Sequence, residues 1–347
     1  MIELLKQLIA IPSVSREEGA AADCLQKWME GRGLQVHRKF NNLWVETEAV
    51  SSKPTILLNA HIDTVKPAPG YTRDPFTPSL EGDRLYGLGS NDDGGSLVSL
   101  LEVFLRLNGK ELPYRLVFSA SAEEEVCGAT GLVSILPEIG KVELGIIGEP
   151  TGMQMAVAEK GLLVLDCTSH GQSGHAARNE GVNALYAALD DINWFRSYSF
   201  PKVNPQLGPV KMTVTIINAG TQHNVVPDKC VFTVDIRPNG EYTNQEIVDM
   251  VRASVSCDVQ PRSMLHNSSS IPMEHPFVKA GLALGLEAFG SPTTSNQTVI
   301  TEFKTIKIGP GQSSRSHSAD EYICVSEIED AVDIYLKLLE SYGNTME

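Results

Sequence analysis

The chain has 347 residues, of which 42% are hydrophobic, and its formal net charge is −15. This length and apolar content suffice for one large domain or two ordinary ones. The negative charge argues against nucleic acid and anionic membrane surfaces as partners.

The six cysteines (24, 127, 167, 230, 257 and 324) show no close spacing. Such scatter is typical neither of a zinc ribbon nor of a disulfide framework, and it favours free thiols in a reducing compartment. Residues 1–6 indicate an amphipathic helix start, because a signal peptide would carry a basic segment and an uninterrupted apolar core. No apolar run reaches the length of a membrane span, so we expect a soluble, cytoplasmic protein.

The first part of the chain alternates between predicted helices and strands. Apolar spacing predicts a helix over 2–9, and the Ser15–Glu18 pattern predicts a capping box that opens a second helix running to 32–33. Further strands are expected at 34–38, 43–46, 55–58, 114–120 and 144–147, with helices at 96–107 and 128–136. This alternation predicts an α/β domain with a mainly parallel sheet.

The pattern changes near residue 161. Strands are expected at 162–169, 211–218, 230–237 and 255–265, and helices at 182–195 and 243–254. This β-α-β-β-α-β order predicts a ferredoxin-like α+β insert over residues 161–271. Residues 1–160 and 272–347 would form the main domain, which ends with a helix at 276–289, a strand at 305–308 and a helix at 325–342.

Polar clusters follow directly on several of the apolar strands. A catalytic zinc site uses histidine nitrogens and carboxylate oxygens, and a two-metal site needs about five protein ligands and a nearby general base. The candidate ligands are His61, Asp92, Glu125, Glu149 and His317. Glu124 is the candidate base, and Asp63 is placed to fix the tautomer of His61. Each cluster alone has an ordinary structural explanation, and their repeated placement after strands favours a metal site.

Five motifs together resemble one zinc-dependent family of metallohydrolases, the aminoacylase and carboxypeptidase family that includes acetylornithine deacetylase and succinyl-diaminopimelate desuccinylase. They are His61-x-Asp63, Gly87–Asp93, Glu123–Gly128, Gly148–Thr151 and His317–Glu321, in order along nearly the whole chain. The resemblance implies two Zn²⁺ ions per chain, with cobalt or manganese able to substitute. His61 and Glu149 would bind one zinc, Glu125 and His317 the other, and Asp92 would bridge them. The Asp92–Asp93 peptide would be cis.

The resemblance also implies that the insert is a lid and dimerisation domain, making the protein a homodimer. His175, in Gly171–Ala176, would polarise the scissile carbonyl; without the resemblance, a turn histidine is the simpler interpretation. Asn224 and Arg237 would contact the substrate, although Arg237 could equally form a structural ion pair. Gly309 belongs to the expected substrate loop, and Arg315 is either a carboxylate clamp or a solvated loop arginine. Gly94 stands where the family often has lysine, and Asn296 where it often has aspartate.

The expected activity is metal-dependent hydrolysis of a small N-acyl-L-amino acid. Acetylornithine in arginine biosynthesis is favoured, with acetylcitrulline or succinylornithine as close relatives. The alternatives within the class are succinyl-diaminopimelate desuccinylase and a dipeptidase or tripeptidase. A non-catalytic metal-binding scaffold is the alternative from another class, and the presence of Glu124 argues against it because a scaffold needs no general base.

Overall fold

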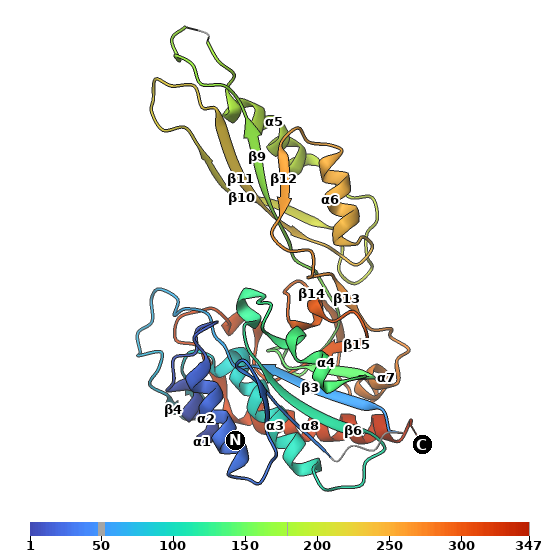
Figure 1. Ribbon diagram of the computed structural model, residues 1–347. Helices are drawn as coiled ribbons and strands as arrows, with labels where there is room; N and C mark the ends of the chain where they lie inside the picture. The colour runs from blue at the N-terminus through green and yellow to red at the C-terminus, as the bar shows by residue number, and fades with distance from the viewer. Residues whose placement is uncertain (48–52, 179, 347) are drawn as a thin grey trace. The chain divides into compact units, whose positions relative to one another are not determined.

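The computed structural model describes residues 1–47, 53–178 and 180–346. They form two units, one made of 1–157, 270–289 and 295–347, the other of 158–269 and 290–294 (Figure 1). The sequence predicts domain limits at 160/161 and 271/272. The observed limits lie at 157/158 and 269/270, and residues 290–294 also belong to the second unit. Within these residues, no helix combines the length and apolar character that crossing a bilayer requires.

The first unit is organised around a mainly parallel sheet, which confirms the α/β prediction. At its centre, β3 pairs in parallel with both β6 and β7, and β7 pairs in parallel with β15. The strand order is β1 (His37–Lys39), β2 (Asn42–Glu46), β6 (Arg115–Ser121), β3 (Thr55–His61), β7 (Leu144–Ile147), β15 (Lys304–Lys307), β8 (Met155–Glu159) and β13 (Ser269–Ser270), with β14 (Ala288–Ser291) also on β8. A separate small sheet joins β16 (Tyr322–Cys324), β5 (Arg84–Tyr86) and β4 (Ser79–Glu81).

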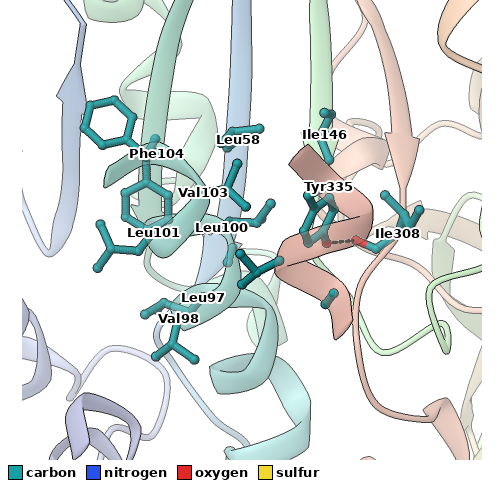
Figure 2. Close-up of a cluster of buried hydrophobic side chains, with 14 of the residues drawn as sticks. Leu58, Leu97, Val98, Leu100, Leu101, Val103, Phe104, Ile146, Ile308 and Tyr335 are labelled. Carbon is teal, nitrogen blue, oxygen red and sulfur yellow. Dashed lines mark hydrogen bonds between the residues drawn. The ribbon is translucent and has the colours of Figure 1, made fainter. Parts of the chain in front are cut away.

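Both faces of the central sheet are covered, as expected for strands that are apolar throughout. Leu58 of β3 and Ile146 of β7 belong to the large core that also includes side chains of the long helices α3 (Gly95–Leu107) and α8 (Val325–Gly343) (Figure 2). Leu57, the next residue of β3, belongs to the cluster beside α4 (Leu136–Ile139). The remaining helices of this unit are α1 (Ile2–Ile9), α2 (Gly19–Glu30) and α7 (Pro276–Ala283).

Tyr335 ties α8 to the end of β15. Its ring is completely buried, and its hydroxyl donates a 2.6 Å hydrogen bond to the carbonyl of Ile308 (Figure 2). We predict that Tyr335→Phe lowers the free energy of unfolding by about 1–3 kcal/mol, because the buried carbonyl loses its partner. Urea denaturation measures this loss. Tyr114→Phe is the comparison, since the Tyr114 hydroxyl lies 3.3 Å from the carbonyl of Leu339 and should contribute less. An unchanged midpoint for Tyr335→Phe would contradict the prediction.

The second unit has the predicted β-α-β-β-α-β order. Its sheet runs β10 (Lys211–Ala219), β11 (Lys229–Arg237), β9 (Leu163–His170) and β12 (Asp258–Pro261), with every neighbouring pair antiparallel. Helices α5 (Ala184–Ser197) and α6 (Asn244–Arg252) follow β9 and β11 in the chain. This is the ferredoxin-like arrangement, with its own core that includes Phe195, Phe232 and Ile247.

Three local predictions were wrong. The Ser15–Glu18 segment is no capping box, because α2 begins after Glu18 and the Ser15 hydroxyl bonds Asp63 instead. The predicted helix 128–136 is a 3₁₀ turn at Leu132–Ser134 followed by α4, whose first turn accommodates Pro137. The helix expected to reach 289 ends at Ala283, because Gly285 adopts a left-handed conformation with φ of 85°.

Candidate metal centre

Three parallel strands deliver most of the predicted ligands to one edge of the sheet. His61 is the last residue of β3 and stands in register with Ser121, the last residue of β6. Glu124 and Glu125 follow β6 within one short turn, and Glu149 follows β7. Because parallel strands point the same way, the side chains after their carboxyl ends converge, as in other open α/β sheets.

The other two predicted ligands come from loops. Asp92 lies in the segment Ser90–Gly94, which precedes α3, and the Asp92–Asp93 peptide is cis, as the family resemblance implies. His317 has a φ of 57°, an uncommon conformation for a residue with a side chain. Its imidazole is half exposed, whereas that of His61 is buried.

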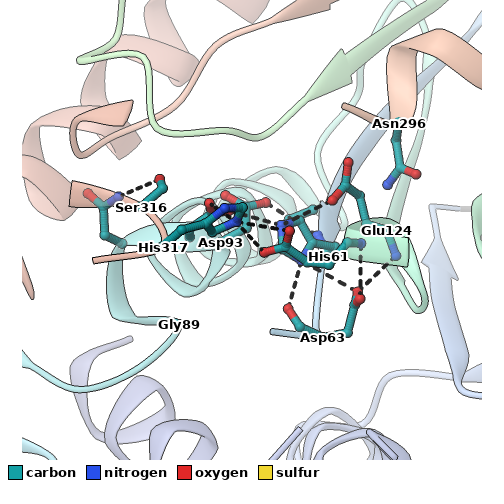
Figure 3. Close-up of polar contacts among 12 residues, drawn as sticks. His61, Asp63, Gly89, Asp93, Glu124, Asn296, Ser316 and His317 are labelled. Atoms are coloured by element: carbon teal, nitrogen blue, oxygen red, sulfur yellow. Dashed lines mark hydrogen bonds and ion pairs between the residues drawn. The ribbon is translucent and has the colours of Figure 1, made fainter. Parts of the chain in front are cut away.

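Asp92 lies between the two histidines. One carboxylate oxygen is 3.1 Å from Nε2 of His61, and the other is 3.6 Å from Nε2 of His317. His317 Nε2 also lies 3.0 Å from both oxygens of Glu125. Glu124 Oε2 is 4.0 Å from Nε2 of His61 (Figure 3). The two oxygens of the Asp92 carboxylate therefore face different histidines.

The buried carboxylates of this cluster are electrostatically costly without a cation. Burial, with added repulsion from neighbouring carboxylates, raises the pKa of Glu124 and that of Glu149 well above the ordinary value. Burial would also raise the pKa of Asp92, but its contact with His61 and the charge of His317 lower it. The hydrogen bond with Glu125 raises the pKa of His317 to about 9, so a metal would replace a proton there.

The donor set fits divalent cations such as zinc. The ligand atoms of His61, Asp92 and Glu125 lie within 4.8 Å of one another, and so do those of His61, Glu124 and Glu149. Imidazole nitrogen and carboxylate oxygen are zinc ligands, and cobalt or manganese can use the same types. Glu124 is thus near enough to the other ligand atoms to act as a ligand or as a base.

Asp63 connects the histidine to the turn that carries the glutamates. Its oxygens accept hydrogen bonds from the backbone N–H of Glu124 (3.1 Å) and of Glu125 (3.2 Å), and from the hydroxyl of Ser15 (2.6 Å). The carboxylate also lies 3.5 Å from Nδ1 of His61, and the Asp63 carbonyl lies 2.8 Å from the same nitrogen. Asp63 therefore orients His61, and it also fixes the backbone of Glu124 and Glu125.

We predict that Asp63→Asn weakens metal binding by about 10–100-fold, the range typical of residues that orient ligands. The amide would turn an N–H₂ group toward backbone donors that need an acceptor. Isothermal titration of the metal-free protein measures the effect. Ser15→Ala removes only one of the bonds to Asp63 and should weaken binding less. Equal affinity in Asp63→Asn and the unmodified protein would refute this role.

Two of the predicted substrate contacts make other interactions in the first unit. Arg315 forms a double ion pair with Glu327, with N–O distances of 2.7 and 3.1 Å, and stacks over Tyr322. A Cβ at Gly309 would lie 2.5 Å from the Glu149 carbonyl oxygen, so this glycine lets the backbone pass close to a ligand residue. Their contacts to a substrate stay predictions.

The other three predicted residues lie in the second unit. His175 is exposed, and its Nδ1 accepts a 3.1 Å hydrogen bond from the N–H of Ala177. The Asn224 carbonyl accepts from the N–H of Ala176, which holds the His175 turn. Arg237 pairs with Asp235 at 2.8 and 3.0 Å, the structural ion pair that the sequence left open. Their catalytic and substrate roles remain predictions.

Several further residues support the centre through contacts that the sequence alone did not reveal. The carboxylate of Glu321 accepts from the backbone N–H of Gly89, Asn91 and Asp92, at 3.0, 2.9 and 2.9 Å. Asn296 is buried and donates to Asn59 (3.0 Å) and to Ser121 (2.9 Å), two residues of the strands that end at the site. A side chain at Gly94 would collide with the Gly89 carbonyl, so this chain has no space for the lysine common in the family.

Comparisons with known proteins identify the family of the chain. The chain is 28% identical to acetylornithine deacetylase from Proteus mirabilis over 98% of this chain and 96% of that protein. It is 26% identical to succinyl-diaminopimelate desuccinylase from Gluconobacter oxydans, over 99% and 97% of the two chains. Among solved structures, a tripeptidase from Staphylococcus aureus superimposes with a TM-score of 0.79 at 18% identity, covering 99% of this chain and 98% of that one.

A dinuclear metal-binding peptidase from Bacillus subtilis has a TM-score of 0.74 at 15% identity, covering 99% of this chain and 98% of that one. The family model described as "Peptidase family M20/M25/M40" matches residues 57–341, a range that holds every predicted metal ligand. The chain therefore belongs to peptidase family M20/M25/M40 and is a hydrolase of that family.

Proposed function

We propose that this hydrolase removes the acyl group from a small N-acyl-L-amino acid, with N-acetyl-L-ornithine as the first candidate substrate. The observation that carries the proposal is the position of Asp92 between His61 and His317 with Glu124 beside them. The full-length similarity to acetylornithine deacetylases supports the choice of substrate.

In the proposed centre, His61 and Glu149 would hold one Zn²⁺, Glu125 and His317 would hold the other, and Asp92 would be a ligand shared by both. When bound, the metal pair supplies Lewis acidity toward the amide carbonyl and lowers the pKa of water at the site. Asp63 keeps the ring of His61 and the Glu124–Glu125 backbone in place.

Glu124 is the proposed general base and acid. It accepts a proton from the water whose oxygen attacks the amide carbon, and it gives that proton to the amine nitrogen as the carbon–nitrogen bond breaks. The products are a carboxylic acid and a free amino acid. His175 would donate a hydrogen bond to the oxyanion, with Asn224, Arg237, Arg315 and Gly309 as candidate substrate contacts.

A second candidate is succinyl-diaminopimelate desuccinylase activity, which the similarity to the Gluconobacter oxydans protein supports. The experiment is a panel of N-acetyl-L-ornithine, N-acetyl-L-citrulline, N-succinyl-L-ornithine, N-succinyl-L,L-diaminopimelate, a dipeptide and a tripeptide, with released amine measured by chromatography. We expect the highest kcat/KM for acetylornithine. A higher kcat/KM for the diaminopimelate compound would instead favour desuccinylase activity. Hydrolysis of none of these compounds would refute the proposed deacylase function.

We further propose a homodimer formed through the second unit. β10 is the end strand of its sheet, and Ile216 and Ile217 on it are 51% and 46% exposed. An exposed apolar edge strand is a surface that another strand can pair with, and two-fold symmetry would bring together two copies of it. Light scattering should give twice the 37.7 kDa chain mass. Ile217→Lys should reduce that mass, and a monomeric unmodified protein would refute the dimer.

The cellular location is proposed to be the cytoplasm. Among the described residues, none of the six cysteines forms a disulfide bond, which suits a reducing compartment. Fractionation of the source cells would test the location, and recovery of the protein outside the cytoplasmic fraction would contradict it.

A further inference from the structure

Asn91 lies directly before the proposed bridging ligand and is completely buried. Its side-chain amide pairs with the backbone of Gln312 in both directions. The Gln312 N–H donates to Asn91 Oδ1 at 3.0 Å, and Asn91 Nδ2 donates to the Gln312 carbonyl at 3.1 Å. Nδ2 also lies 3.2 Å from the hydroxyl of Ser316. One side chain therefore fastens two loops that are far apart in the sequence.

The backbone is shaped to allow this contact. Gly311 has a φ of 81°, and a Cβ at that position would collide with Oδ1 of Asn91. A residue with a side chain would be strained there and would also displace the amide. The close approach of the 309–317 loop to Asn91 thus depends on a glycine at 311.

The backbone is held differently at the ligands of the two proposed metal sites. His61 and Glu149 follow paired strands of the central sheet, which fix their backbone. His317 instead sits in a loop, is half exposed and has a left-handed backbone conformation. Its neighbour Ser316 and the nearby Gln312 are the residues that Asn91 holds.

Glu321 also holds the segment that contains Asn91 and Asp92. It binds the backbone N–H groups of Asn91 and Asp92, so the position of the Asp92 segment does not depend on the Asn91 side chain alone. Loss of the Asn91 amide would therefore release mainly the loop that carries His317.

We propose that Asn91 is a positioning residue that sets the affinity of the metal site formed by His317 and Glu125, without being a ligand itself. The inference rests on the proposed function only in requiring that the centre takes up two metal ions. In this proposal, the site of His61 and Glu149 is positioned by strands of the central sheet. The site of His317 and Glu125 depends on a loop that the buried Asn91 amide holds in place.

The test compares Asn91→Ala with the unmodified protein. Metal-free samples are titrated with Zn²⁺ by calorimetry and with Co²⁺ by visible absorbance. We expect the first equivalent to bind as in the unmodified protein and the second to bind about 10–100-fold more weakly, the range for outer-shell partners. Hydrogen exchange should become faster in 309–317 and stay unchanged in β3. If Asn91→Ala does not fold, Asn91→Ser is used, with the same expectation.

Asn239→Ala is the matched control. Asn239 is also completely buried and joins backbone groups, donating to the carbonyls of Lys202 and Gly208 in the second unit. The Asn239→Ala variant should be less stable than the unmodified protein but should bind both metal ions with unchanged affinity. Two unchanged equivalents in the Asn91 variant, or equal weakening of both, would overturn the inference while the proposed function stands. An unmodified protein that binds no metal would instead refute the proposed function and the inference with it.

Discussion

Glu124→Gln is expected to lower kcat by about 10²–10⁴-fold, the contribution of a general acid–base residue. Glutamine keeps the size of the side chain but cannot accept the proton from the attacking water. Metal content should stay near that of the unmodified protein, because the ligands are unaltered. Initial rates with acetylornithine and metal analysis of the same samples measure both quantities.

The metal analysis distinguishes the two roles that the geometry allows Glu124. If one metal is lost together with activity, Glu124 is a ligand and the assignment as base is wrong. Glu123→Gln is the matched control: Glu123 is the adjacent carboxylate, and it accepts a hydrogen bond from the hydroxyl of Thr130. We expect that variant to keep its kcat.

Asp92→Ala is expected to weaken the binding of both metals, by more than the roughly 10–100-fold seen for residues that only orient ligands. The reason is that its two oxygens face different histidines, at 3.1 Å from His61 and 3.6 Å from His317. Activity at fixed metal concentration should fall with occupancy. Titration with Zn²⁺ followed by calorimetry measures both affinities.

Asp320→Asn controls for the loss of one negative charge. Asp320 is close to His317 in the sequence, but its carboxylate accepts from the N–H of Thr72 at 2.9 Å and is not part of the candidate centre. We expect unchanged metal affinities. If Asp92→Ala weakens only one of the two equivalents, Asp92 belongs to a single metal and the bridging role is excluded.

The sequence predicted the α/β sheet because its strands are apolar on both faces and alternate with helical periodicity. It also predicted the ferredoxin-like order of the second unit, where turn signals separate each element. Strands β8 and β14 were missed, because the glycines and prolines close to them in the sequence are typical of turns. The end of α7 was misplaced because one glycine, Gly285, decides it.

For the site, the sequence could predict residues whose type is chemically unusual after a strand, such as His61 and Glu149. It could not predict Asn91 or Glu321 as supports, because their roles depend on loops that meet only in the folded chain. Ser15 shows the same limit: its spacing to Glu18 favoured a helix cap, but the 2.6 Å bond to Asp63, a residue distant in sequence, prevailed. Contacts between residues far apart in the sequence compete with local signals, and no sequence spacing predicts them.

We propose that one set of converging side chains makes this protein a metal-dependent amide hydrolase: His61, Asp92, Glu124, Glu125, Glu149 and His317. Its most direct test follows acetylornithine hydrolysis while Zn²⁺ or Co²⁺ is added stepwise to chelator-treated protein. We expect no turnover by the metal-free protein and a rise in rate that levels off at two metal ions per chain. Full turnover of the metal-free protein, or no hydrolysis of any N-acyl amino acid after two ions have bound, would contradict it.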